Sequence, residues 1–316
     1  MPMYNAGAGV EHTINALLAQ TLKSMEIIIV NDGSTDESAE LVHRYAAANE
    51  HIKVIDQPNG GVSRARNSGL AVAGGLYVTF PDADDVMQPD MYQTLTDMAM
   101  AEDLDVAQCN AECCFLQGQY TRHLIPYDRL QSVGVMSGPA WLNKALLTDR
   151  YLHVVWMAIY RLSLIRQLQL IFEPGLHHQD IPWTTELMMN ASRVRYIDAP
   201  LYRYTVHHQS VSHRKRTGQY NVAYQRHYLK VVRMLDEINR RYASRVKIYP
   251  SFHRQVTREA LVICHAIRRE PDKDTQQEMI DEFFSSDTHK IMLRNARGIE
   301  QWYQLLLWLA RLKRWS

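Results

Sequence analysis

Residues 26–36 read EIIIVNDGSTD, and this stretch decides the fold. Its first six residues are mostly a β-branched apolar run that predicts a buried strand, and the Asp-Gly-Ser that follows predicts a loop. Residues 36–49 continue as an expected helix, with Asp36 as its cap. The segment therefore predicts a strand-loop-helix unit whose polar loop lies at the carboxyl end of the strand.

The same alternation of strand and helix continues through the first half of the chain. Further strands are expected at residues 51–55, 77–80, 105–109 and 154–160, and further helices at 63–73, 91–101, 139–147 and 181–191. This order predicts an α/β fold, with a mostly parallel sheet and helices on both of its faces. In such sheets ligands bind outside the carboxyl ends of the strands.

The last hundred residues differ from the rest in pattern. Apolar residues there recur at three- and four-residue spacing, which predicts helices at 220–242, 252–268, 276–284 and 300–313. The polar stretch HRKRTG at 213–218 indicates a boundary, so we expect an α/β domain at 1–215 and a helical, basic extension at 216–316. The Trp- and Leu-rich final helix has two interpretations: it lies on a membrane surface, or it packs on its neighbours.

The formal net charge of +1 is the sum of an acidic front and a basic back. Residues 1–200 contain 13 Lys and Arg against 23 Asp and Glu, whereas residues 201–316 contain 22 against 11. The basic part favours an anionic partner, but no nucleic-acid-binding motif is present, so we do not expect nucleic acid. Four cysteines exclude a disulfide scaffold, and neither a signal peptide nor a membrane-spanning run is found, so a cytoplasmic location is expected.

The densest group of carboxylates is Asp82-Ala83-Asp84-Asp85, directly after the strand expected at 77–80. Like charges repel, so a loop that gathers three of them is typical of a divalent cation site. Ligands that are all oxygen favour Mg²⁺ or Mn²⁺. The alternative is a solvated acidic turn before a helix.

Other polar positions also allow two interpretations. Asp32 either accepts a hydrogen bond from a ligand or braces its own turn. Arg66 lies in the first turns of a helix that opens at a Gly-Gly turn, where phosphate oxygens bind well. Asp180 is either a general base in a cleft or the N-cap of a helix. The adjacent His207 and His208 either contact a metal or phosphate, or lie on the surface.

Four motifs in order resemble glycosyltransferase family 2 of the GT-A fold: Pro2-Met3-Tyr4-Asn5, NDGSTD at 31–36, Gly61-x-Ser63-x-Ala65-Arg66-Asn67-x-Gly69 and DADD at 82–85. The resemblance implies inverting transfer of a sugar from a nucleotide donor with Mg²⁺ or Mn²⁺, in a catalytic domain at 1–215. Asp180 matches the family's base, with Gln179 where Glu is usual. The implied nucleotide-binding residues are Pro2, Tyr4, Asp32, Arg66 and Asp82, and the implied metal or diphosphate contacts are Asp84, His207 and His208.

Longer segments, such as GLHHQDIPWTTE at 175–186, resemble enterobacterial family members that add glucuronic acid to a heptose of the lipopolysaccharide inner core. This resemblance implies UDP-glucuronate as donor and an acceptor at the cytoplasmic face of the inner membrane. Two alternatives stay open: a capsule or other surface-polysaccharide glycosyltransferase with a different UDP-sugar, and a non-catalytic nucleotide-sugar-binding protein. Family members begin with an apolar strand before the Pro-x-Tyr-Asn motif. Because Met1 directly precedes Pro2 here, we expect this first strand to be missing.

Overall fold

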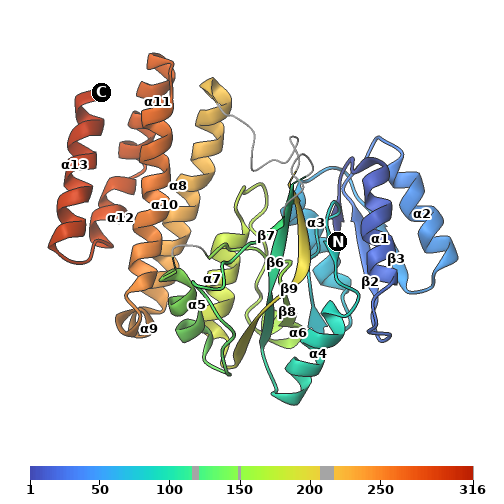
Figure 1. Ribbon diagram of the computed structural model, residues 1–316. Helices are drawn as coiled ribbons and strands as arrows, with labels where there is room; N and C mark the ends of the chain where they lie inside the picture. The colour runs from blue at the N-terminus through green and yellow to red at the C-terminus, as the bar shows by residue number, and fades with distance from the viewer. Residues whose placement is uncertain (116–120, 149–150, 207–216, 316) are drawn as a thin grey trace.

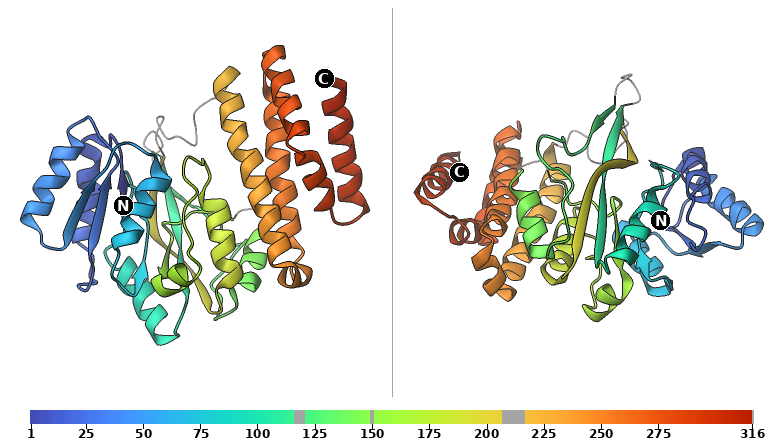
Figure 2. Two further views of the ribbon diagram at one scale, coloured as in Figure 1. Left: turned by 180° about the vertical axis from the view of Figure 1, so that it is seen from behind. Right: turned by 60° about the horizontal axis from the view of Figure 1, so that its bottom comes forward.

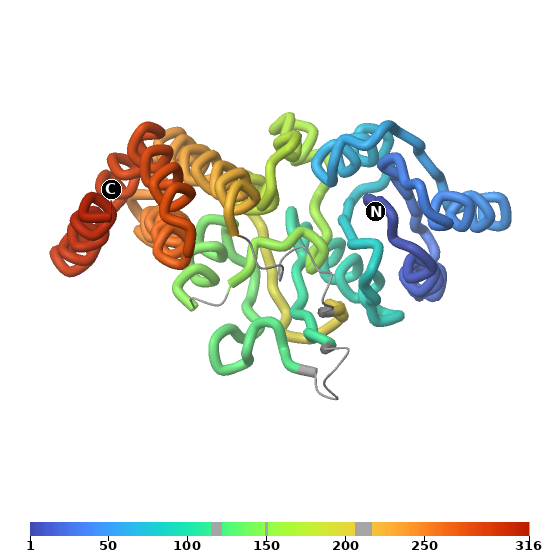
Figure 3. Tube along the Cα trace, turned by 90° about the horizontal axis from the view of Figure 1, so that it is seen from above, coloured from blue at the N-terminus to red at the C-terminus, as the bar shows by residue number. Residues whose placement is uncertain are grey.

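The computed structural model describes residues 1–115, 121–148, 151–206 and 217–315. They form two β-sheets followed by a group of helices (Figure 1). The N-terminal sheet lies at one end of the molecule, the second sheet lies in the middle, and the C-terminal helices lie at the other end. The view from above shows the same order (Figure 3). The acidic front and the basic back of the sequence are thus separated in space.

The first sheet has three parallel strands in the order β1 (Pro2–Met3), β2 (Ile27–Asn31) and β3 (Ile52–Asp56). The helices that follow these strands are α1 (Val10–Leu18), α2 (Ser38–Ala48) and α3 (Val62–Val72). Met3 pairs with Asn31, which pairs with Asp56, so all three strands end at the same edge. Strand β1 has two residues, and both belong to the Pro-x-Tyr-Asn motif itself.

The second sheet is mixed. Its order is β4 (Tyr77–Val78), β8 (Ala158–Arg161), β6 (Val106–Phe115), β9 (Val194–Val206) and β5 (Val86–Met87), with β7 (Thr121–His123) paired to β6. Strands β6 and β9 run parallel, whereas the other pairs are antiparallel. The predicted α/β class is correct, but the parallel geometry is limited to the first sheet and to this one pair. Apolar runs predict strands without indicating their direction.

Strand β9 was not expected from the sequence, because Pro200 interrupts its pattern. The register shifts beside Asn110, which lies opposite Pro200, so the ladder continues past the proline. On the buried face of β9, Tyr196 stacks on Trp141 with ring centroids 5.0 Å apart. This strand therefore contributes much of the central core.

Four helices accompany the second sheet: α4 (Met91–Ala101), α5 (Gly138–Leu146), α6 (Leu162–Gln167) and α7 (Asp180–Asn190). Helix α5 approaches the end of α7 closely, because the amide of Gly138 donates to the carbonyl of Ala191 at 2.9 Å. A Cβ atom at Gly138 would lie 2.2 Å from the carbonyl oxygen of Met188, so this approach requires glycine. The contact fixes α7, whose first residue is Asp180.

The C-terminal helices are α8 (Gly218–Arg241), α9 (Ala243–Ile248), α10 (Ser251–Arg269), α11 (Lys273–Ser285), α12 (Thr288–Arg294) and α13 (Ile299–Trp315). Helix α8 runs beside α7 (Figure 2), and the amide of Asn190 donates to the Tyr242 hydroxyl at 2.8 Å. Gln255 of α10 donates to the Thr185 hydroxyl at 3.0 Å. The helices are therefore joined to α7 by buried polar contacts as well as by apolar packing.

Helix α13 combines features of both interpretations of its sequence. Leu305, Leu309 and Leu312 are buried against the neighbouring helices. A second apolar face is exposed, and its residues are Ile299, Trp302, Tyr303, Leu306 and Leu307. Across the described parts of the chain, no helix has the length and apolar character needed to cross a membrane.

Candidate functional site

The loops that follow β1 and β2 are joined at the carboxyl edge of the first sheet. The Asn5 side chain accepts from the Thr35 amide at 2.8 Å, and the Asn5 amide donates to the Ser34 hydroxyl at 3.1 Å. Asp36 accepts from the amide of Gly7 at 2.8 Å, so it braces this loop. It also accepts from the amide of Ser38, the first residue of α2, at 3.2 Å, so its carboxylate supplies the predicted cap although Glu37 occupies the N-cap position. Tyr4 remains 53% exposed at the strand end, which leaves its ring open to a planar ligand.

Asp32 is buried at the end of β2, and its carboxylate organises the loop before α3. It accepts from the Gln57 amide at 2.6 Å and from the backbone amides of Gly60 and Gly61 at 3.0 and 2.7 Å. Gly61 has a φ of +83°, which favours glycine. Asp32 therefore braces the loop before α3 and not its own turn, where the Ser34 amide donates instead to Oδ1 of Asn31 at 3.0 Å. Among the described residues, Oδ2 of Asp32 accepts only from the Gly61 amide.

Arg66 is the residue through which the acidic loop meets α7. Its guanidinium is almost fully buried, and Nη2 lies 2.8 Å from Oδ1 of Asp82. The side-chain amide of Gln179, in the orientation that satisfies both of its ends, accepts from Nη1 at 2.6 Å and donates to the Leu176 carbonyl at 3.1 Å. The guanidinium carbon also lies 5.4 Å from the centroid of the Phe172 ring, as in a cation–π contact. One side chain therefore joins α3, the acidic loop and the start of α7.

Asp180 is the first residue of α7, whereas Gln179 occupies the N-cap position, so the N-cap interpretation is not what the structure shows. Burial raises the pKa of Asp180 to about 7, and Arg66 opposes this shift while Asp82 adds to it. Burial also raises the pKa of Asp82, again against Arg66. The two carboxyls therefore share the field of one guanidinium. A carboxyl with a pKa near 7 is suited to take and release a proton at neutral pH.

The three carboxylates of the acidic loop have different surroundings. Asp85 is fully buried and accepts from the Tyr202 hydroxyl and the Thr205 amide, both at 2.9 Å. Burial raises its pKa to about 8, so it anchors the loop to β9 and does not serve as an outward ligand. Asp82 pairs with Arg66, and Asp84 is exposed. The sequence suggested that the three carboxylates converge on one cation. In the structure they do not, because each of them faces a different environment.

The remaining ligand set still suits a cation that binds through a nucleotide. In the described ranges, no three His, Cys, Asp or Glu side chains are arranged to hold a metal ion. Mg²⁺ and Mn²⁺ with phosphate substrates commonly use one or two carboxylates, with phosphate and water oxygens as the other ligands. Asp84 and the second oxygen of Asp82 fit that pattern. His207 and His208 lie outside the described residues.

Sequence reasoning missed three contributors to the site. Gln57 holds Asp32, Phe172 lies against Arg66, and Tyr202 accepts from the Asp82 amide at 3.2 Å while holding Asp85. Tyr202 lies in an aromatic-rich segment of β9, but its partners are about 120 positions earlier in the chain. Only the fold brings such distant residues together.

This chain is similar to known glycosyltransferases along its whole length. The family model described as glycosyl transferase family 2 matches residues 1–167, and the model described as the C-terminal domain of glycosyltransferase YibD matches residues 217–316. The uncharacterized glycosyltransferase YibD of Escherichia coli K12 is 50% identical over 315 residues, covering 100% of this chain and 92% of YibD.

Two solved structures share the fold. Staphylococcus aureus TarS 1–349 in complex with UDP-GlcNAc gives a TM-score of 0.58 at 18% identity, covering 98% of this chain and 90% of that one. Mannosyltransferase PcManGT from Pyrobaculum calidifontis, in complex with GDP-Man and Mn²⁺, gives 0.54 at 15% identity, covering 99% and 81%. The predicted GT-A fold is therefore confirmed.

The pairing of Arg66 with Asp82 is testable by a double-mutant cycle. Arg66→Met is expected to lower the free energy of unfolding by about 2–4 kcal/mol, because it leaves a partly buried carboxylate without its cation. Combined with Asp82→Asn, it should show a coupling energy of about 0.5–3 kcal/mol in urea denaturation. Arg64→Met, at an exposed position of the same helix, is the control and should cost under about 0.5 kcal/mol. Strictly additive effects would show that the pair contributes nothing.

Proposed function

The chain belongs to glycosyltransferase family 2, and from this premise we propose that it transfers glucuronic acid from UDP-glucuronate to a heptose of the lipopolysaccharide inner core, with inversion. The observation that carries a catalytic role is the meeting of Arg66, Asp82 and Asp180, with the Asp180 pKa at about 7. The UDP and UDP-GlcNAc found in TarS support a uridine nucleotide donor. The resemblance of residues 175–186 to enterobacterial members supports glucuronate and the heptose acceptor.

The nucleotide would bind at the joined loops of the first sheet. The exposed Tyr4 ring would stack on the uracil, with Pro2 supporting it from β1. Oδ2 of Asp32 would accept from the base N3–H beside the Gly61 amide. Arg66 would orient Asp82 toward the ribose, since their ion pair holds the carboxylate beside α3. His207 or His208 would contact the diphosphate.

The reaction would be a single displacement. Asp180 would accept the proton of the attacking acceptor hydroxyl while the new C–O bond forms and the bond between the anomeric carbon and the UDP oxygen breaks. Its pKa of about 7 allows it to be ionised before the reaction and to hold the proton afterwards. A Mg²⁺ or Mn²⁺ ion held through Asp84 would neutralise charge on the leaving diphosphate.

UDP release tests this function and the role of Asp180 together. Wild type should release UDP from UDP-glucuronate only when purified core lipopolysaccharide is added, and Asp180→Asn should lower turnover at least about 100-fold while UDP binding persists. Because the base must be ionised, wild-type kcat/KM should fall as pH decreases below about 7. Release with another UDP-sugar or acceptor would indicate a polysaccharide transferase. UDP binding without turnover on any acceptor would indicate a binding protein.

The metal role has a readout independent of turnover. Asp84→Ala should weaken UDP binding in the presence of Mn²⁺ by about tenfold or more, because the bridging ion loses its protein carboxylate. Calorimetry with and without Mn²⁺ measures this. Asp90→Ala is the control, since Asp90 is exposed and its side chain makes no cap hydrogen bond. Equal UDP affinities for wild type and Asp84→Ala with Mn²⁺ would count against the metal role.

We further propose that the exposed apolar face of α13 lies on the cytoplasmic face of the inner membrane. Ile299 is 91% exposed and Leu306 is 51% exposed, an unusual exposure for apolar residues spaced along one helix. Arg311, Lys313 and Arg314 follow on the same helix, and their charge is complementary to anionic lipids. The acceptor of the proposed reaction would be embedded in that membrane.

Vesicle sedimentation tests this surface. Trp302→Ser combined with Leu306→Ser should weaken association with phosphatidylglycerol-containing vesicles by about tenfold, since two apolar side chains no longer enter the interface. Gln304→Ser, at an exposed position of the same helix, should leave association unchanged. Equal association of both variants, or association insensitive to salt, would contradict the proposal.

A further inference from the structure

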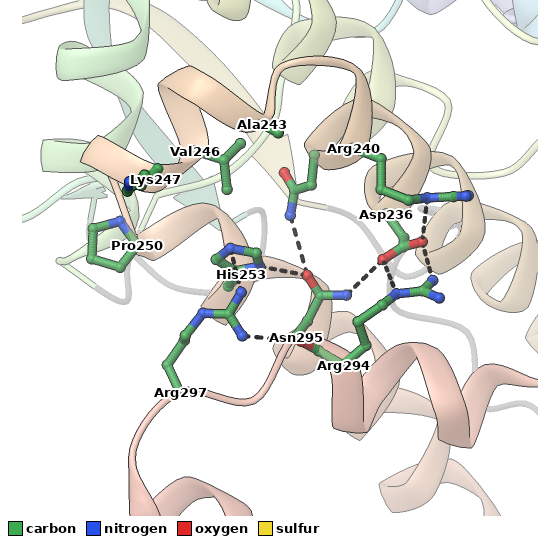
Figure 4. A pocket seen from close by; sticks show the side chains of 11 residues that line it. Asp236, Arg240, Ala243, Val246, Lys247, Pro250, His253, Arg294, Asn295 and Arg297 are labelled. Atoms are coloured by element: carbon green, nitrogen blue, oxygen red, sulfur yellow. Dashed lines mark hydrogen bonds and ion pairs between the residues drawn. The ribbon is translucent and has the colours of Figure 1, made fainter.

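A cavity of about 450 Å³ lies within the C-terminal helices, between α8, α9, α10 and the segment that links α12 to α13 (Figure 4). Four of its lining residues are cationic: Arg240 from α8, Lys247 from α9, Arg294 from the end of α12, and Arg297. The single carboxylate in its wall is Asp236. The lining therefore has an excess of three positive charges.

Asp236 orients two of these cations. It is 2% exposed, and its two oxygens contact Nε and Nη2 of Arg294, Nε of Arg240 at 3.1 Å and the amide of Asn295 at 2.7 Å. The carboxylate is thus fully engaged by its neighbours. Asp236 therefore holds one edge of the Arg240 guanidinium and one edge of the Arg294 guanidinium. More than half of each arginine side chain stays exposed.

Arg297 is held by a second chain of hydrogen bonds. Its Nη1 donates to the carbonyls of Arg294 and Ala296 at 3.0 and 2.8 Å, and its Nη2 donates to Nε2 of His253 at 2.6 Å. Nδ1 of His253 in turn contacts Oδ1 of Asn295 at 2.7 Å. Burial lowers the pKa of His253, so a neutral imidazole that accepts from Arg297 is the consistent form. The third cation is therefore positioned as well.

Two cations retain donors for a ligand. Among the described residues, neither the Nη atoms of Arg240 nor Nζ of Lys247 has a hydrogen bond or ion pair. A second cavity adjoins Arg240 and Arg294 on the other side, and Arg233 and Lys290 extend its positive lining. This pair of arginines therefore lies between two cavities whose linings are both net positive. Guanidiniums oriented by hydrogen bonds, and an ammonium in the same cavity lining, supply the positive charge and the N–H donors that a phosphate group binds.

We propose that this cavity binds a phosphate group. None of its residues is among those proposed to bind the donor, which follow the strands of the N-terminal sheet and line the start of α7 (Figure 1). The phosphate would therefore not be that of the nucleotide. It belongs either to a lipid or glycolipid in a membrane or to a compound in solution, and the inference holds whether or not the proposed transfer reaction is correct.

Thermal unfolding of the full chain tests the site with inorganic phosphate as the probe. Phosphate should raise the unfolding temperature of wild type more than sodium chloride of equal ionic strength does, because binding to the native state stabilises it. Lys247→Gln should reduce this extra rise, and Arg240→Gln combined with Lys247→Gln should abolish it. Lys247 makes no contact in the network, so its variant keeps the test valid if the double variant folds poorly.

Arg254→Gln is the matched control, because Arg254 is an exposed cation of α10 that does not line the cavity. It should keep the full phosphate effect. An equal phosphate effect in wild type and in both cavity variants would overturn the proposal. So would an effect of chloride as large as that of phosphate.

A second measurement identifies the source of the phosphate. Phosphatidylcholine vesicles with and without phosphatidic acid are sedimented with each variant. Loss of phosphatidic-acid-dependent association in the double cavity variant, but not in Arg254→Gln, would support a membrane-borne phosphate. Retained vesicle association with a lost response to inorganic phosphate would support a soluble phosphate compound.

Discussion

The buried guanidinium of Arg66 is the interaction on which the site depends. Burying a cation costs free energy unless opposite charge, hydrogen bonds or an aromatic face compensate it, and Asp82, Gln179 and Phe172 supply all three. These partners come from the acidic loop, the start of α7 and the segment before α7. The partners of this one side chain therefore join α3 and the acidic loop to the segment 172–179, which lies about a hundred positions later in the chain. Gln179 contributes a neutral acceptor here, so among the described residues Asp82 is the one carboxylate that forms an ion pair with Arg66.

The same guanidinium sets the proton affinity of Asp180. Burial raises the pKa of that carboxyl, and Arg66 limits the rise to a value of about 7. Without the arginine, the carboxyl would hold its proton more strongly and would be a poorer base at neutral pH. With less burial, the pKa of the carboxyl would be lower. It would then be fully ionised at neutral pH but would bind a proton only weakly. The near-neutral pKa of Asp180 is therefore a product of two opposing effects that both arise from packing around α7.

The sequence predicted what is local and not what is distant. The run 26–31 and its loop predicted β2 and the placement of Asp32, because periodicity and turn residues act over a few positions. The acidic loop was predicted as a cluster of ligands, yet Asp85 turns inward because Tyr202 and Thr205 on β9 receive it. Strand β9 itself was missed, since Pro200 breaks its pattern and only pairing with β6 makes it a strand. Strand direction was likewise unreadable, because the alternation of side chains is identical in parallel and antiparallel pairs.

The distribution of charge also depends on the fold and cannot be read from the net charge of the sequence. A net charge of +1 describes neither end of the molecule, because salt screens charges over roughly 8 Å at physiological ionic strength. The cations around Asp236 lie within the C-terminal helices, whereas Arg66 and Asp82 lie in the α/β part of the chain, so neither group neutralises the other. Each group instead contains an opposite charge of its own: Arg66 pairs with Asp82, and Asp236 pairs with Arg240 and Arg294. Arg66 is more deeply buried than Asp82, and Asp236 is more deeply buried than Arg240 and Arg294. A buried central charge can orient the charged side chains around it while their outer edges stay open to a ligand.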